Sequence, residues 1–136
     1  MANFRMSFIQ KLMKEPSKIN FFISLPMNGL SDDEIIHNME EIKESTIKYL
    51  MADETVPINF IDSFQKSTEL IRLGRIAMLG HSISLMYNAD FVIFRKGWRE
   101  ARGCCVEFEV CKQYNIPAFE FDYETKSFSS MEYIKN

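Results

Sequence analysis

The chain has 136 residues, of which 46% are hydrophobic, so it is long enough for one domain built around one core. Its net charge of −3 and its lack of a basic cluster argue against a protein that binds nucleic-acid polymers. No apolar run approaches the roughly 18–20 residues that a membrane-spanning helix needs, and residues 1–16 lack the features of a signal peptide, so we expect a cytoplasmic protein without membrane contact.

The first segment, residues 1–18, supports more than one interpretation. Its apolar residues approximate one face of a short helix that would end at Glu15-Pro16. Such an N-terminal arm or helix would pack on its own subunit or on a neighbouring one, and a disordered start is the remaining alternative.

Apolar runs alternate with helical periodicity from residue 19 onward. The run 19–25 is apolar on both faces, which is typical of a buried parallel strand, and a turn at 26–29 ends it. Ser31 and Glu34 have the spacing of a capping box and predict a helix that reaches about residue 51. Its inner side is expected to contain Ile35, Met39, Ile42, Thr46 and Leu50.

A second strand is predicted at 56–61, and a helical region follows it to about residue 87. Gly74 and Gly80 weaken this region, so we expect it to break in two. Its inner stripe is expected to contain Leu73, Ile76, Ala77, Gly80, Ile83 and Tyr87. Short apolar runs at 91–94 and 116–121 predict two further strands, and residues 122–136 form a polar C-terminal tail.

Strands that alternate with helices indicate an α/β fold with a parallel sheet and right-handed crossovers. Ligands bind such sheets beyond the carboxyl ends of the strands. The loops 24–29 and 95–103 both follow predicted strands, so we expect them to share one rim of the sheet.

The helix predicted at 102–114 carries a carboxylate in an apolar position. One arc of this helix is polar and contains Glu109, Lys112 and Gln113. The opposite arc contains Cys104, Val106, Phe108, Val110, Cys111 and Tyr114. Glu107 projects into the middle of that apolar arc, where an isolated carboxylate is very costly. Glu107 is therefore either a functional group or a structural one that is paired with Arg99 or Arg102 or lies at an oligomer interface.

Four segments stand at an informative spacing. They are FISLPMNG at 22–29 followed by an acidic helix start, NADFVIF at 88–94, Gly97-Trp98, and Gly103-x-x-x-Glu107. Together they resemble the nucleoside 2-deoxyribosyltransferase-like superfamily, and within it the DUF4406 group of phage and bacterial genomes. The resemblance covers roughly residues 19–121 and implies one domain there, with a flavodoxin-like or Rossmann-like three-layer fold and a small central parallel sheet.

The resemblance also implies a reaction. In the transferases a Glu that follows Gly-x-x-x at a helix start is the nucleophile on the anomeric carbon of the sugar, and Glu107 occupies that position. A homo-oligomer in which a neighbouring subunit completes the site is implied as well. Phe22 stands where the transferases carry a Tyr, and Arg95-Lys96-Gly97-Trp98 lacks their base-binding Asp. The added positive charge suits a phosphate, as in the deoxynucleotide-hydrolase branch.

Several further residues are candidates for substrate binding. Arg99 and Arg102 would bind phosphate through forked donors or lie solvated at the surface. Trp98, next to Gly97, would stack on a base or anchor its loop in the core, and His81 fits a surface histidine better than an acid–base group. The loop before the acidic helix would hold sugar or phosphate groups, or form an ordinary turn. The candidates in that loop and at the Glu107 helix start are Ser24, Pro26, Met27, Asn28, Gly29 and Gly103.

Three Cys residues, two of them adjacent, do not form the pattern of a disulfide scaffold or a zinc site. We expect reduced thiols, no metal and no cofactor. The leading hypothesis is a nucleotide-directed N-glycosidic bond hydrolase or deoxyribosyltransferase-like protein that uses Glu107. The alternatives are a non-catalytic protein that binds a nucleotide or an ADP-ribose-type ligand, and a purely structural domain.

Overall fold

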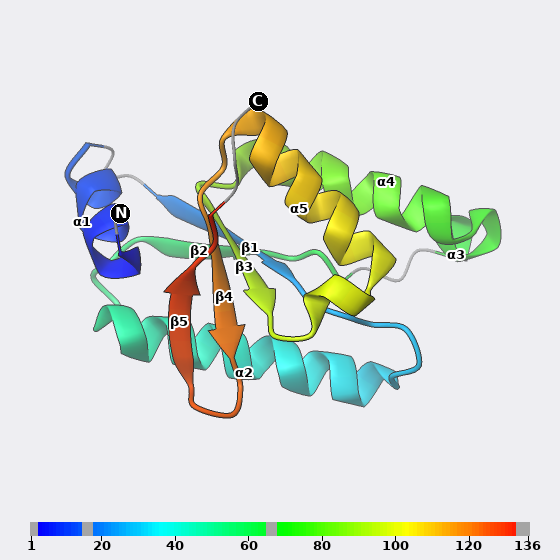
Figure 1. The fold of residues 1–136 in the computed structure, drawn as a ribbon, viewed down its shortest axis with the longest axis horizontal. Coiled ribbons are helices and arrows are strands. Elements are labelled where there is room, and N and C mark those ends of the chain that lie inside the picture. The colour runs from blue at the N-terminus through cyan, green and yellow to red at the C-terminus, as the bar shows by residue number, and fades with distance from the viewer. Residues whose placement is uncertain (1–2, 15–17, 65–67, 133–136) are drawn as a thin grey trace.

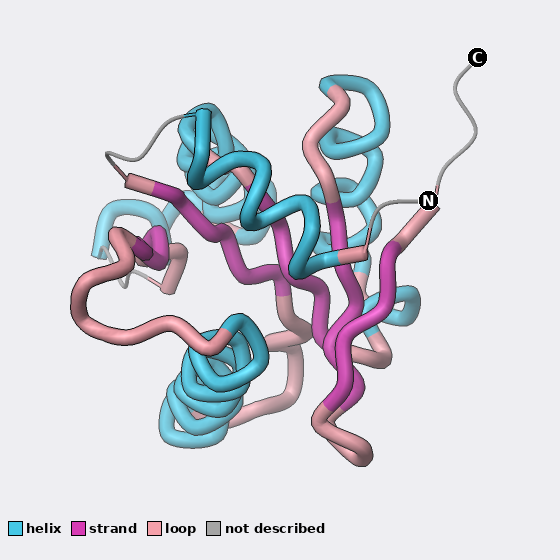
Figure 2. Tube along the Cα trace, turned by 90° about the vertical axis from the view of Figure 1, so that its left-hand side faces the viewer, coloured by secondary structure: helices cyan, strands magenta, loops and turns pink. Residues whose placement is uncertain are grey.

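The computed structural model describes residues 3–14, 18–64 and 68–132. A five-stranded sheet lies between helices on both of its faces (Figures 1 and 2). In chain order the elements are α1 (Phe4–Lys14), β1 (Ile19–Ser24), α2 (Asp32–Leu50), β2 (Ile58–Ile61), α3 (Thr68–Leu73), α4 (Arg75–Leu85), η1 (Met86–Asn88), β3 (Phe91–Arg95), η2 (Trp98–Glu100), α5 (Arg102–Tyr114), β4 (Ala118–Asp122) and β5 (Ser127–Ser130). Among these helices none is both long enough and apolar enough to cross a membrane.

The strand order is β2-β1-β3-β4-β5, and β1 to β4 are parallel. This order is the one found in flavodoxin-like folds, and it confirms the predicted three-layer α/β fold. The fifth strand was not predicted, because the polar tail shows no apolar run. It pairs with β4 in the antiparallel direction, and Phe121 and Phe128 are register partners.

Two cores lie on the two faces of the sheet. On one face α1 and α2 pack on side chains from β1, β3 and β4 (Figure 1). On the other face α5 and η1 cover a second cluster that includes Phe22, Val92 and Phe94. Because neighbouring residues of a strand point to opposite faces, every residue of β1 is buried. This burial on both faces is what the apolar run 19–25 predicted.

The helix α2 begins and ends as the sequence indicates. Ser31 is its N-cap: the Ser31 hydroxyl accepts from the amide of Glu34, and the Glu34 carboxylate accepts from the amide of Ser31. Four of the five predicted inner residues are buried, and Leu50 is half-buried in the last turn. The turn 26–29 and this helix therefore place the end of β1 in a fixed position.

The first helix packs on its own subunit. Phe4 and Phe8 are only 2% and 4% exposed, and they lie in the core of the α2 face. Lys11 adds an ion pair to Asp90, with 3.1 Å between Nζ and Oδ1. The predicted helix end at Glu15-Pro16 lies outside the described residues. Of the alternatives for residues 1–18, packing within the same chain holds for the part that the structure describes.

The region 68–87 breaks as predicted, but the predicted inner stripe is largely wrong, since only Ala77 and Ile83 of its residues are half-buried. Gly74 has a φ of +98° and separates α3 from α4, whereas Gly80 lies within α4. Ile76 and Tyr87 are 88% and 87% exposed, and Leu73 is 58% exposed. In α4 the face that turns inward is the neighbouring one, which contains Leu79, Ser82 and Leu85. No side chain of α3 or α4 is fully buried.

Candidate functional site

A pocket of about 260 Å³ opens at the carboxyl end of β1. Here β1 leads through α2 to β2 on one side, while its neighbour β3 leads through α5 to β4 on the other. Such a switch point leaves a crevice in which open α/β sheets bind ligands. The pocket is lined by Ile23, Ser24, Leu25, Pro26, Met27, Asn28, Ser63, Phe64, Leu70, Arg75, Met78, Leu79, His81, Ser82, Ala101, Gly103, Cys104 and Glu107.

Glu107 lies in the wall of this pocket and is only 6% exposed. Its two carboxylate oxygens accept hydrogen bonds from different elements. The Ser24 hydroxyl donates to Oε1 from the end of β1, and the Ser82 hydroxyl donates to Oε2 from α4, both at 2.7 Å. A carboxylate that accepts at both oxygens is held in one orientation, and this arrangement suits its ionised form, which has acceptors only.

Opposing effects act on the pKa of Glu107. Burial raises this pKa above the usual value of 4.5, because the charged form loses its hydration. The hydrogen bonds from Ser24 and Ser82 lower it, but burial prevails, so the pKa of Glu107 is raised. A carboxyl group that titrates above its usual range in a pocket has the properties expected of an active-site group.

Hydrogen bonds from serines occur in place of the ion pair with Arg99 or Arg102, which was the structural alternative to a functional role. Among the residues that the structure describes, no Lys or Arg forms an ion pair with Glu107. The predicted apolar arc is partly wrong, since Val106 and Tyr114 are 40% and 76% exposed. The inner face of α5 is narrower and contains Cys104, Glu107 and Cys111 as its buried residues.

Most of the loop after β1 lies at the pocket. Ser24, Pro26, Met27 and Asn28 all line it, as the sequence predicted for this rim. Gly29 does not, and its φ of +82° instead allows the turn that leads into α2. The backbone there requires a residue without a Cβ, so Gly29 has a conformational role.

The basic loop turns away from the pocket, and this corrects its predicted placement. Gly97, Trp98, Arg99 and Arg102 do not line the pocket, and of the described loop residues only Ala101 and Gly103, at its far end, do. Trp98 is 4% exposed, and its Nε1 donates to Glu120 Oε2 at 2.9 Å. It anchors the loop in the core, which was the alternative to base stacking.

The two arginines of the loop face other surroundings. The Arg99 guanidinium lies 4.6 Å from the centre of the Trp98 ring, and its Nη1 is 3.7 Å from Glu120 Oε2. Arg102 is exposed at the start of α5. Neither arginine lines the pocket that contains Glu107.

The helix α4 contributes pocket residues that were not predicted. Arg75, Met78, Leu79, His81 and Ser82 all line the pocket. A Cβ built on Gly103 would lie 3.6 Å from Leu79, which shows how closely the first turn of α5 approaches α4. The sequence signal for these residues was the polar pair His81-Ser82 in a mainly apolar helix. The predicted inner stripe placed this pair on the solvent side of the helix, so the signal was missed.

The two buried thiols of α5, Cys104 and Cys111, do not provide a nucleophile. Cys104 lines the pocket, and burial raises the pKa of its thiol to about 12. Burial has the same effect on Cys111. Both thiols remain protonated near neutral pH, whereas only the thiolate form of a cysteine is a strong nucleophile. Among the described residues no cluster of three or more His, Cys, Asp or Glu side chains could hold a metal ion.

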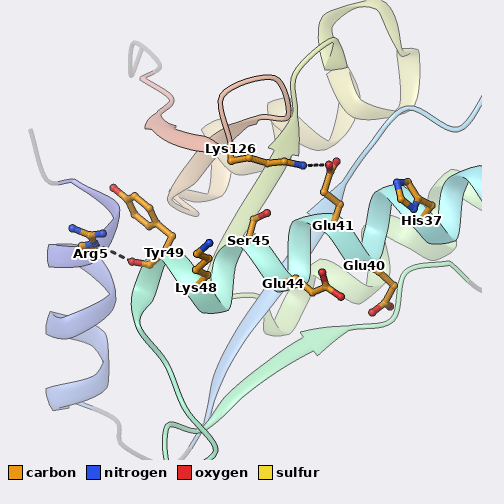
Figure 3. Close-up of a pocket in the computed structure, with 9 residues that line it drawn as sticks. All are labelled: Arg5, His37, Glu40, Glu41, Glu44, Ser45, Lys48, Tyr49 and Lys126. Carbon is orange, nitrogen blue, oxygen red and sulfur yellow. Dashed lines mark hydrogen bonds and ion pairs between the residues drawn. The ribbon is translucent and has the colours of Figure 1, made fainter.

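A larger groove of about 760 Å³ runs along the outer side of α2 (Figure 3). It is lined by Arg5, His37, Glu40, Glu41, Glu44, Ser45, Lys48, Tyr49 and Lys126. Its charges are mixed and partly paired: Lys126 contacts Glu41, and Arg5 donates to the carbonyl of Tyr49. No lining residue is fully buried, so the groove lacks the desolvated group that distinguishes the pocket at Glu107.

Comparisons with protein-family models, curated proteins and solved structures find no match for this chain.

Proposed function

We propose that the chain cleaves the N-glycosidic bond of a nucleotide, with Glu107 as the nucleophile. The observation that carries this proposal is the position of Glu107, a buried carboxylate held at both oxygens in a pocket at the switch point of the sheet. Breaking an N-glycosidic bond builds positive charge on the sugar, and a fixed carboxylate stabilises that charge.

The proposed reaction has two steps. In the first, one Glu107 oxygen bonds to the anomeric carbon, and the electron pair of the broken carbon–nitrogen bond leaves with the base. In the second, water attacks the same carbon and releases the sugar, and its proton goes to the displaced base. A second base in place of water would give transfer instead of hydrolysis.

Ser24 and Ser82 support this role because their hydrogen bonds stabilise the negative charge of Glu107. Phe22 has no hydroxyl to offer the pocket, and its ring is fully buried in the core on the α5 face. Ser24 and Ser82 bring two hydroxyls to the carboxylate instead. Both favour the ionised form, which is the form that attacks carbon.

Replacing Ser82 with Ala is expected to move the acid limb of the pH–activity profile to higher pH. Activity requires ionised Glu107, so it is present above the pKa of Glu107 and is lost as the pH falls through that value. The Ser82 hydroxyl lowers this pKa, and its removal therefore raises it. The measurement is base release as kcat/KM against pH. Ser84→Ala on the same helix, whose hydroxyl donates to the His81 carbonyl, should leave the limb in place. An identical limb in Ser82→Ala and wild type would contradict the role of this serine.

A binding protein without turnover is the second candidate. It is favoured by the number of carboxyl groups in the pocket, because Glu107 is the only carboxylate among the described residues that line the pocket. A nucleotide or ADP-ribose-type ligand would then bind without a second acid to assist the leaving group. Incubation with a nucleotide panel separates the two functions: free base supports cleavage, whereas unchanged ligand recovered after denaturation supports binding alone.

We also propose that the chain forms a homo-oligomer through α3 and α4. These helices expose Ile71, Leu73 and Ile76, and η1 directly after them exposes Tyr87; such a set of apolar side chains is typical of an interaction surface. Light scattering is expected to give a mass above 16.0 kDa, and Ile76→Glu is expected to shift it toward the monomer. Met13→Glu, at an equally exposed position on α1, is the matched control. A monomeric wild type at micromolar concentration would contradict the proposal.

A further inference from the structure

Arg75 is the one full cation among the described residues that line the pocket. No other Lys or Arg lies among the described residues that line it. Arg72, three residues earlier, does not line the pocket and is paired with Glu69, with 2.6 Å between Nη2 and Oε1. In the part of the chain that the structure describes, Arg75 forms no such pair. Its guanidinium is therefore available to an anion from outside.

The helix α4 fixes the position of Arg75 relative to Glu107. Arg75, Leu79 and Ser82 are four and three residues apart, so they share one face of the helix. Seven residues at a rise of 1.5 Å place Arg75 about 10 Å from Ser82 along the axis. Ser82 donates to the Glu107 carboxylate and Arg75 lines the same pocket, so the two charged residues lie at opposite ends of this stretch of α4.

The lining between these two ends is mainly apolar. Met78 and Leu79 lie between Arg75 and Ser82 along α4, and Leu70 from α3 also lines the pocket. A ligand that fits this pattern carries an uncharged middle part and an anionic group at the end away from Glu107. A sugar whose anomeric carbon faces Glu107 carries its 5′-substituent on the opposite side of the ring.

We propose that Arg75 is a specificity-determining residue that binds the 5′-phosphate of the substrate. The choice of a nucleotide as the ligand rests on the proposed function. A guanidinium binds phosphate through two parallel hydrogen bonds and keeps its charge at every relevant pH. This assignment replaces Arg99 and Arg102, which the sequence indicated for the same task and which the structure places elsewhere.

Binding to a turnover-deficient protein tests Arg75 separately from catalysis. The background is Glu107→Gln, and the probes are the four 2′-deoxynucleoside 5′-monophosphates and the matching nucleosides, followed by calorimetry. The measured quantity is the ratio of the two affinities. Adding Arg75→Ala is expected to reduce the preference for the phosphorylated probe by about 10–100-fold, the usual contribution of a charge-assisted hydrogen bond. Adding Arg75→Lys should restore part of the preference.

Two matched controls complete the experiment. Arg72→Ala removes a neighbouring arginine outside the pocket, and Arg99→Ala removes the arginine that the sequence favoured; both should retain the preference. Equal affinity for phosphorylated and unphosphorylated probes, binding of neither, or an equal loss in Arg72→Ala would overturn the role of Arg75. If Arg75 determines the preference but the wild type releases no base, the inference holds and the proposed cleavage fails.

Discussion

Glu107→Gln is expected to lower the rate of base release by about 10³-fold or more. An amide has no negative charge to share with the anomeric carbon and is a very poor nucleophile. The change keeps the size and shape of the side chain, and the Ser24 and Ser82 hydroxyls still find a hydrogen-bond partner. Loss of activity would therefore report on the chemistry of the carboxylate and not on the packing of the pocket.

The measurement is base release from a nucleotide panel under single-turnover conditions. Glu109→Gln is the matched control, because Glu109 lies two residues away on the exposed side of α5 and only accepts from Gln113. This control should keep wild-type activity. Equal base release by Glu107→Gln and wild type would exclude Glu107 as the nucleophile.

The same variant should melt at a higher temperature than wild type near neutral pH. Burial raises the pKa of Glu107 in the folded protein above its usual value of 4.5, so the folded state holds this proton more tightly than the unfolded chain. Wild type then loses stability as the pH rises through the raised pKa, whereas Gln does not titrate. The advantage of the variant should be full above the folded pKa and disappear below pH 4.5. A large drop in melting temperature would mean that the charge of Glu107 stabilises the fold.

The carboxylate itself could be found from the sequence, because a single charged residue interrupts a 3.6-residue pattern. The helix α5 has the predicted bounds, and Glu107 is buried as predicted. The partners of Glu107 could not be found in the same way. Ser24 and Ser82 lie 83 and 25 residues away from it. The position of α5 at the end of β1 brings Ser24 to Glu107, and the packing of α4 against α5 brings Ser82.

The basic loop shows why residues close in sequence to a site can lie outside it. Gly97 has a φ of +96°, and the short helix η2 then directs Trp98 into the core. The core offers two aromatic rings, Phe94 and Phe108, with ring centres 5.3 and 4.9 Å from that of Trp98, and a carboxylate on β4 accepts from the indole. These contacts are made across strands and helices, so no local pattern of charge or polarity indicates them.

The position of the first helix, α1, also depends on tertiary contacts and not on its local sequence pattern. Its amphipathic pattern is short, and the sequence leaves open whether it packs at all. The structure places Phe4 among aromatic side chains of α2, β1, β3, β4 and β5. The centre of its ring lies 4.3 Å from the ring centre of Phe119 and 5.3 Å from that of Phe128. Phe128 belongs to the strand that was not predicted. The two terminal segments therefore cover the same end of the core.

Phe4→Ala is accordingly expected to lower the free energy of unfolding by about 3–5 kcal/mol, the usual cost of removing a buried aromatic side chain. The ring fills space that residues of the sheet cannot reach by relaxing, because β4 and β5 are held in register by their backbone hydrogen bonds. Denaturant unfolding of the full chain measures the effect. Ile9→Ala on the same helix is the control, since Ile9 is 47% exposed and its loss should change stability by much less. A cost below about 1 kcal/mol for Phe4→Ala would show that α1 is a peripheral arm, and the core beneath it would then have to be stable without this helix.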